Sequence, residues 1–144
     1  MECRDKLGNL KWNTGWFSNG ITNAGFAELA NLAGNVSSPT AFTYLAVGTS
    51  TTAFAASQTA LQAEITDTGL ARAAASVTIQ TTTVTNDTLQ LVHTWTATGS
   101  KTVEEVGIFN AASSGTMLGR ALTTTKALTE DDTLAITYQV VFAV

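Results

Sequence analysis

The sequence predicts a mainly β protein: an antiparallel β-sandwich or a jelly-roll-like barrel with one short helix and an extended N-terminal arm. Threonine and alanine account for 27 and 22 of the 144 residues, a composition that favours β structure with small side chains. From residue 70 onward, segments with a period of two alternate with turns rich in Thr, Ser, Asn and Gly. A convincing helical period occurs in one segment, residues 21–34.

Length and composition predict one domain. A chain of 144 residues can remove roughly 70% of its unfolded surface from water, so it can form a core without metals or disulfides. Hydrophobic residues make up 44% of the chain and the mean hydropathy is +0.16, which excludes a disordered protein. No apolar run approaches the roughly 18 residues of a membrane helix. We therefore expect an arm at residues 1–20, a single domain at residues 21–144 and no membrane association.

The expected arm has neither a helical nor a strand period, and it contains Trp12, Trp16 and Phe17. Burial of three aromatic side chains does not offset the entropy lost when about 20 residues become ordered. The arm therefore needs backbone pairing to a sheet edge, either of its own domain or of a neighbouring subunit. The three aromatic residues are the predicted interface residues if the arm lies on a neighbour.

The predicted helix spans residues 21–34. Thr22 is the expected N-cap, Ile21 and Phe26 are spaced as a hydrophobic staple, and Gly34 is expected to adopt the left-handed conformation at the C-terminus. The expected apolar face has the i, i+3, i+4, i+7 spacing and consists of Phe26, Leu29, Ala30 and Ala33.

The remaining elements are expected to be strands and turns. Residues 42–47 form a strand that ends at Gly48, a loop follows to about Gln58, and residues 59–64 form one helical turn. Residues 70–85 and 88–98 form a hairpin around Asn86-Asp87. Residues 103–110 and 116–124 flank a five-residue loop at 111–115. The last strand has one apolar face throughout, made of Leu134, Ile136, Tyr138, Val140, Phe142 and Val144.

The charges are few and unevenly distributed. The net charge is −4 and the seven Lys and Arg residues are scattered, so we expect no direct nucleic-acid binding. Between Trp12 and Ala63 the one charged residue is Glu28. Such a stretch is buried, rests against another subunit, or forms a neutral surface rich in Thr, Ser and Asn. The single cysteine, Cys3, and the lack of a signal peptide predict folding in a reducing cytoplasm without export.

The residues that carry catalysis in known enzymes are scarce, which predicts a non-enzymatic protein without metal or cofactor. His93 is the one histidine and alternates with apolar residues, so we interpret it as a partly buried residue of the core or an interface. There is no nucleophile elbow, no Cys-x-x-Cys, no pair of histidines and no phosphate-binding loop. The run Glu130-Asp131-Asp132 lacks the spacing of a calcium loop and is interpreted as a solvated turn.

A structural ion pair is expected inside the sheet. Glu104 and Glu105 point to opposite faces of one strand, so one of them is directed toward the interior and needs a cation. Arg72 and Arg120, flanked by small apolar residues, are the candidate partners.

Several short segments stand out when they are taken in order: ITNAGFAELA at 21–30, FTYLAVGTS at 42–50, TALQAE at 59–64, Arg72, EVGIFN at 105–110 and GTMLGR at 115–120. They contain a T-N-A-G helix start, an A-[LV]-G-T strand end, a T-x-L-x-x-E turn, a strand arginine and an E-V-G-[IL]-F strand. Together these segments resemble a broad group of tailed-bacteriophage virion structural proteins, in which the same motifs recur in this order. Similar patterns occur in small head-associated proteins and in the N-terminal domains of tail-collar fibres.

The resemblance implies a location in the virion after assembly in the host cytoplasm. We expect a capsid decoration or cement protein that binds the major capsid protein or other virion subunits. We also expect it to form a homo-oligomer, and a trimer is the oligomer that we favour. The chain ends inside its last strand, without the shaft of a fibre protein, which favours the head. The first alternative is a small tail, collar or baseplate component. The second is a carbohydrate-binding β-sandwich module, for which Trp12, Trp16 and Trp95 are the candidate stacking platforms.

Overall fold

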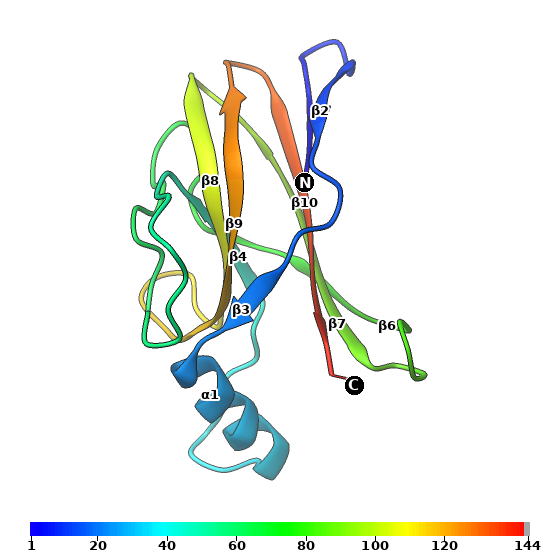
Figure 1. The fold of residues 1–144 in the computed structure, drawn as a ribbon, viewed down its shortest axis with the longest axis vertical. Coiled ribbons are helices and arrows are strands. Elements are labelled where there is room, and N and C mark those ends of the chain that lie inside the picture. The colour runs from blue at the N-terminus through cyan, green and yellow to red at the C-terminus, as the bar shows by residue number, and fades with distance from the viewer. Residues whose placement is uncertain (143–144) are drawn as a thin grey trace.

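The protein is a β-sandwich of two antiparallel five-stranded sheets with one helix, as a computed structural model describes it for residues 1–142 (Figure 1). The predicted fold class is thus confirmed. The first sheet has the strand order β2 (Leu10–Asn13), β1 (Glu2–Arg4), β10 (Thr133–Val141), β7 (Thr88–Thr96) and β6 (Ser76–Gln80). The second has the order β3 (Asn19–Ile21), β9 (Met117–Leu128), β8 (Lys101–Phe109), β4 (Tyr44–Gly48) and β5 (Ala73–Ala74).

The core lies between the two sheets and follows the alternation of β10. Leu134, Ile136, Tyr138 and Val140 are buried, as their period of two predicts. Phe142, which continues the same alternation, is 56% exposed because it lies beyond the end of β10. Val144 lies outside the described residues.

The residues expected to form an arm pair with this chain's own sheets. β1 pairs with β10, β2 pairs with β1, and β3 pairs with β9, so the segment crosses from the first sheet to the second (Figure 1). Cys3 in β1 is fully buried in the core, and this burial raises the pKa of its thiol to about 11. Of the two alternatives for the arm, the structure has the one in which its backbone pairs with its own domain.

Helix α1 (Asn23–Gly34) begins at the predicted N-cap. The Gly25 N–H donates to Thr22 Oγ1 at 2.9 Å, and Thr22 Oγ1 donates to the Met117 carbonyl at 2.6 Å. The left-handed residue at the C-terminus is Asn35, with φ of 49°, and not Gly34 as predicted. Asn35 tolerates this conformation, and its N–H bonds back to the helix. The helix ends at Gly34 as predicted but begins two residues later than predicted, because Ile21 belongs to β3 and Thr22 is the cap.

The predicted apolar face of the helix is wrong for three of its four residues and right for Leu29. Phe26 is 60% exposed, so it forms no staple with Ile21, and Ala30 and Ala33 are also exposed. The face against β9 contains Gly25, where an added methyl group would overlap the Leu118 carbonyl. Leu29 and Leu32 on this side pack against the core. The rotation of the helix is set by this close backbone approach and by the bonds of Thr22.

Two predicted turns also differ. Residues 59–64 form an open turn that ends in a bridge between Gly48 and Glu64, and not a helical turn. The hairpin of β6 and β7 closes at Gln80 and Thr88, so its loop spans residues 81–87 and not Asn86-Asp87 alone. The Asp87 carboxylate organises this longer loop by accepting three backbone N–H groups, from Thr82, Thr83 and Val84.

The strand after the helix and the hairpin of β8 and β9 agree more closely with expectation. β4 ends at Gly48 as predicted but begins at Tyr44, two residues later than expected. Asn110 N–H bonds to the Thr116 carbonyl at 3.2 Å and closes the predicted loop at residues 111–115. Within residues 1–142, no helix is both long and apolar enough to span a membrane.

Candidate functional site

Glu105 and Arg120 meet in a fully buried ion pair on neighbouring strands of the second sheet. Arg120 Nε lies 2.6 Å from Glu105 Oε2, and both side chains are 0% exposed. Glu105 also accepts the backbone N–H groups of Gln62 and Ala63 at 3.1 and 2.8 Å. Arg120 Nη1 donates to the Thr52 carbonyl at 2.8 Å. The pair therefore fastens the loop at residues 49–63 to β8 and β9.

Arg72, the other candidate cation, pairs outside the strands and not with Glu104 or Glu105. Its guanidinium forms two bonds with the Glu64 carboxylate, at 2.9 and 2.7 Å, and lies 3.5 Å from the centroid of the Phe109 ring. Its Nη1 donates to the carbonyls of Ala111 and Ser114. Arg72 thus joins the turn before it to the loop between β8 and β9.

Glu104 lies on the opposite face of β8, half-buried, and accepts the hydroxyl of Thr125. The structure therefore brings together two of the four ion-pair candidates, Glu105 and Arg120. Glu64, the partner of Arg72, was not identified as an ionic partner in the sequence, although it ends the T-x-L-x-x-E turn of the phage-like pattern.

Several of the sequence segments quoted for the expected family resemblance pack close to these ion pairs. Gly25 allows α1 to approach β9, and Gly48 lies where an added methyl group would overlap the Glu105 carboxylate. Gly107 faces Leu61 and the Phe109 ring in a similarly close packing. These residues hold a helix, a long loop and a sheet together. Glu64, Arg72, Glu105 and Arg120 of these segments form two ion pairs, whereas Glu28 accepts hydrogen bonds from Asn31, Thr40 and Asn110.

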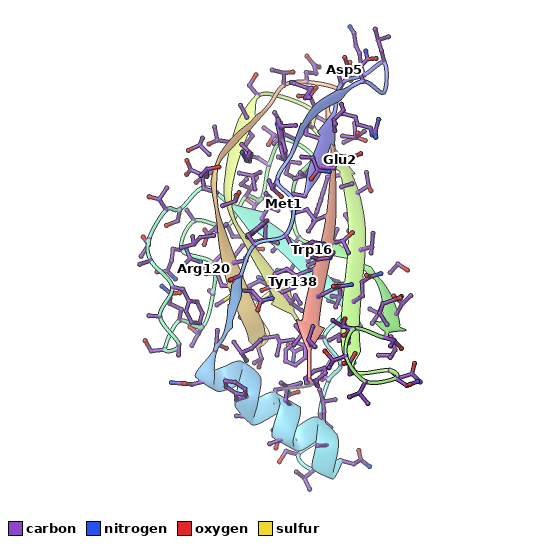
Figure 2. The ribbon with its side chains drawn as sticks, turned by 45° about the vertical axis from the view of Figure 1, so that its right-hand side comes forward. Met1, Glu2, Asp5, Trp16, Arg120 and Tyr138 are labelled. Carbon is purple, nitrogen blue, oxygen red and sulfur yellow. The ribbon has the colours of Figure 1, made fainter. Side chains whose placement is uncertain are left out.

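The three arm aromatics have different environments. Trp12 is half-buried, and its indole N–H donates to the Ala127 carbonyl at 3.0 Å. Phe17 is half-buried against the core. Trp16 is 71% exposed and lies on the segment that crosses between the two sheets (Figure 2).

A small cavity lies beneath Trp16. It has a volume of about 50 Å³, and its walls include Met1, Phe17 and Tyr138. The Tyr138 hydroxyl is buried without a hydrogen-bond partner among the described residues, and burial raises the pKa of this phenol. A second, more open groove of about 320 Å³ also borders Trp16, and its lining includes the polar residues Glu2, Asn13 and Thr137. Trp16 is therefore an exposed aromatic ring beside hydrogen-bonding side chains, whereas Trp95 is buried.

The remaining titratable candidates, His93 and Asp132, contact other residues of the fold. His93 is half-buried and packs edge-on against Trp95, with ring centroids 4.4 Å apart. The interpretation of Glu130-Asp131-Asp132 as a solvated turn holds for the exposed Glu130 and Asp131 but is wrong for Asp132, which is buried because its carboxylate accepts Lys11 Nζ and the Thr129 N–H. Burial opposes ionisation of Asp132, but these donors outweigh it and lower its pKa. Within residues 1–142, no three His, Cys, Asp or Glu side chains gather as ligands of a metal would.

The charge-poor stretch lies largely at the surface. Phe26, Val36 and Phe54 are 60%, 52% and 36% exposed, and residues 51–57 are exposed throughout. Burial in the core therefore does not explain its lack of charge. We use the name neutral surface for two neighbouring exposed parts of the molecule. They are the outer face of α1, which includes Phe26, Ala30 and Ala33, and the loop at residues 51–57.

A comparison of the chain with protein-family models, curated proteins and solved structures finds no match.

Proposed function

We propose that this chain is a non-enzymatic structural protein of a tailed-phage virion, a capsid decoration or cement protein that binds the major capsid protein on the head shell. The observation that carries the proposal is the neutral surface, in which Phe26 is 60% exposed, Phe54 is 36% exposed, and one acid, Glu28, is nearby in sequence. An exposed surface this poor in charge suits a permanent protein contact.

The packing of the second sheet supports the same proposal. A cement protein transmits force between shell subunits, so its contact surface has to be rigidly attached to its core. The Glu105–Arg120 pair fastens the loop at residues 49–63, the Arg72–Glu64 pair fastens the turn that follows this loop, and Thr22 and Gly25 hold α1 against β9. The neutral surface therefore consists of two elements, α1 and the loop at residues 51–57, and each of them is bonded to or packed against β8 or β9.

The chemistry of the titratable groups also agrees with a structural role. The acids that lie inside the molecule, Glu105 and Asp132, are engaged by cations and backbone N–H groups. The buried thiol of Cys3 has a raised pKa, so it is a poor nucleophile near neutral pH. We propose, accordingly, that the protein has no turnover activity and needs no cofactor.

The test is binding of the purified chain to undecorated heads of the phage that encodes it. We expect wild type to saturate the heads in hundreds of copies, and the double variant Phe26→Glu/Ala30→Glu to bind about 30-fold more weakly or worse, as for loss of a buried aromatic contact. Thr124→Glu, a charge added to the exposed part of β9, is the matched control and should bind as wild type. Equal binding by all three proteins would contradict the proposal.

The number of copies per virion separates this proposal from its alternative. Hundreds of copies support head decoration, with trimers where shell subunits meet as the preferred arrangement. A number that matches a single tail, collar or baseplate ring would instead support a small component of one of those parts.

Exposure of Trp16 favours one further candidate, a carbohydrate-binding module. The ring is open to solvent and the groove beside it holds Glu2 and Asn13, a combination that suits a sugar stacked on the indole. A glycan array with wild type and Trp16→Ala tests this candidate. Specific binding that is lost in Trp16→Ala would support it, whereas the absence of glycan binding leaves the virion proposal standing alone.

A further inference from the structure

The outer edge of β6 is free. β6 pairs with β7 along Ser76–Gln80 on one side, and no strand within residues 1–142 pairs with the other side. In Figure 1, β6 lies at the margin of the first sheet, beyond β7 and away from the second sheet. A free edge presents a row of backbone N–H and C=O groups that can accept another strand.

The other three sheet edges carry features that discourage pairing. β2 contains Lys11 and has a shifted register against β1. β3 has three residues, and the Phe54 ring packs over Gly20 at its centre. β5 has two residues. Short strands, lysines and covered edges are the usual protections in native sheets.

β6 has none of these protections. It extends over five residues, and the chain carries no charge and no proline from Ala73 to Asn86. Its register against β7 is regular throughout. Among the edges of the described sheets, β6 is therefore the one most open to strand addition.

The apolar side chains of β6 face the interior side of the sandwich but remain exposed. Val77 and Ile79 lie opposite Leu91 and Leu89 of β7, and Leu91 is fully buried. Val77 and Ile79 are nevertheless 39% and 55% exposed, so the core stops short of the β6 edge. A strand added to β6 would extend both the hydrogen-bond ladder and this apolar strip.

We propose that the occupant of this edge is β6 of a second copy, paired antiparallel about a two-fold axis at Thr78. The strand reads polar, apolar, polar, apolar, polar in either direction. In this register Val77 of each copy faces Ile79 of the other on the interior side, and Thr78 faces Thr78 on the outer side. Because β6 carries no charged residue, its two copies do not repel each other electrostatically. A two-fold symmetric contact also pairs the free β6 edges of both copies at once.

The contact joins the two five-stranded sheets into a single continuous sheet. It is a property of the isolated chain and does not depend on the proposed function. It also differs from the trimer expected on the shell, which would use another surface.

The experiment is cysteine cross-linking in the full chain. Thr78→Cys places two thiols directly opposite each other, within the Cα separation of about 4.4–6.8 Å that a disulfide requires. Ser76→Cys is the matched control, because four residues of offset at about 3.3 Å each separate its two copies by about 13 Å. The native Cys3 is buried and contributes no background. Mild oxidation should convert Thr78→Cys, and not Ser76→Cys, into a species of twice the 15.0 kDa mass.

Light scattering at micromolar concentration completes the test. We expect a wild-type dimer, and we expect Ile79→Lys to raise its dissociation constant by about 10- to 30-fold through loss of two Val–Ile pairs. Because Ile79 is more than half exposed, this variant should keep the wild-type circular dichroism and melting temperature. A monomer or a trimer of the wild type would overturn the inference, as would equal cross-linking of the two cysteine variants or a dimer that Ile79→Lys leaves unchanged.

Discussion

Replacement of Glu105 by Gln is the perturbation for which the structure gives the largest expected effect. The substitution keeps the shape of the side chain but removes its charge, and it leaves the Arg120 guanidinium in a site that is 0% exposed. Breaking a buried ion pair in this way typically costs about 3–5 kcal/mol, because the remaining charge is desolvated without compensation. That is a large part of the about 5–15 kcal/mol by which a domain is usually stable.

The expected signal is a large fall in thermal stability. For a chain of this length, 1 kcal/mol shifts the melting temperature by about 3 °C, so Glu105→Gln should melt about 10 °C below wild type. Glu104→Gln is the matched control, since the neighbouring carboxylate is partly exposed and bonds one hydroxyl. This control should change the free energy of unfolding by about 0.5 kcal/mol or less.

A double variant decides whether the ion pair is the cause. Glu105→Gln/Arg120→Met removes both charges, so it should recover part of the stability that Glu105→Gln loses. Limited proteolysis should show early cleavage within residues 49–63 in the single variant, because Gln62 and Ala63 lose their charged acceptor. A Glu105→Gln protein as stable as Glu104→Gln, or a double variant whose loss is the sum of two large single losses, would refute the reasoning.

Three further predictions test other parts of the fold. Deletion of residues 1–18 should lower the melting temperature by several degrees, because Cys3 and its strand leave the core; unchanged melting would mean that the segment does not pack on its own domain. Gly25→Ala should destabilise the protein, seen as a lower urea midpoint, because the methyl group overlaps the Leu118 carbonyl; Gly34→Ala, where a methyl group would make ordinary van der Waals contact with Val36, is the control. Asp87 has a lowered pKa, first through its bond from the Val84 N–H, so its stabilising contribution is complete above about pH 4 and is lost as the pH falls through the folded-state pKa. Asp87→Asn should therefore weaken the acid dependence of urea unfolding between pH 5 and pH 2, and an unaltered dependence would contradict the assignment.

The elements that the sequence predicts well are those whose pattern follows from local chemistry. The alternation of β10 and the N-cap at Thr22 depend on a period of two and on one hydroxyl. The face of α1 could not be predicted in the same way. Its apolar spacing points to Phe26, but the helix packs through Gly25, where the lack of a side chain permits contact. The spacing of apolar residues cannot predict a contact that depends on the absence of a side chain, as at Gly25.

Tertiary arrangement limits prediction of the candidate sites for a different reason. The alternation of residues in β8 indicates that Glu104 and Glu105 face opposite sides, but the pairing of Arg72 with Glu64 depends on a turn that brings the two together. In the same way, the residues of β6 are recognisable as a strand, whereas their position at a sheet edge depends on the strand order. The first 20 residues would use the same backbone groups to pair with their own domain or with a neighbouring subunit. The sequence therefore could not distinguish these two arrangements.

The distribution of the few charges links the stability of the fold to its expected association. Five of the seven cationic side chains are held in salt bridges within residues 1–142: Arg4, Lys11, Arg72, Lys101 and Arg120. The charges therefore serve mainly to fasten loops and strands, and few of them can solvate the outer face of α1 or the edge of β6. A surface charge as low as this does little to keep molecules apart in solution. Because most of the cations are used to fasten the fold, the outer face of α1 and the edge of β6 are left with few charges, and these are the two surfaces that we propose as contacts with other proteins.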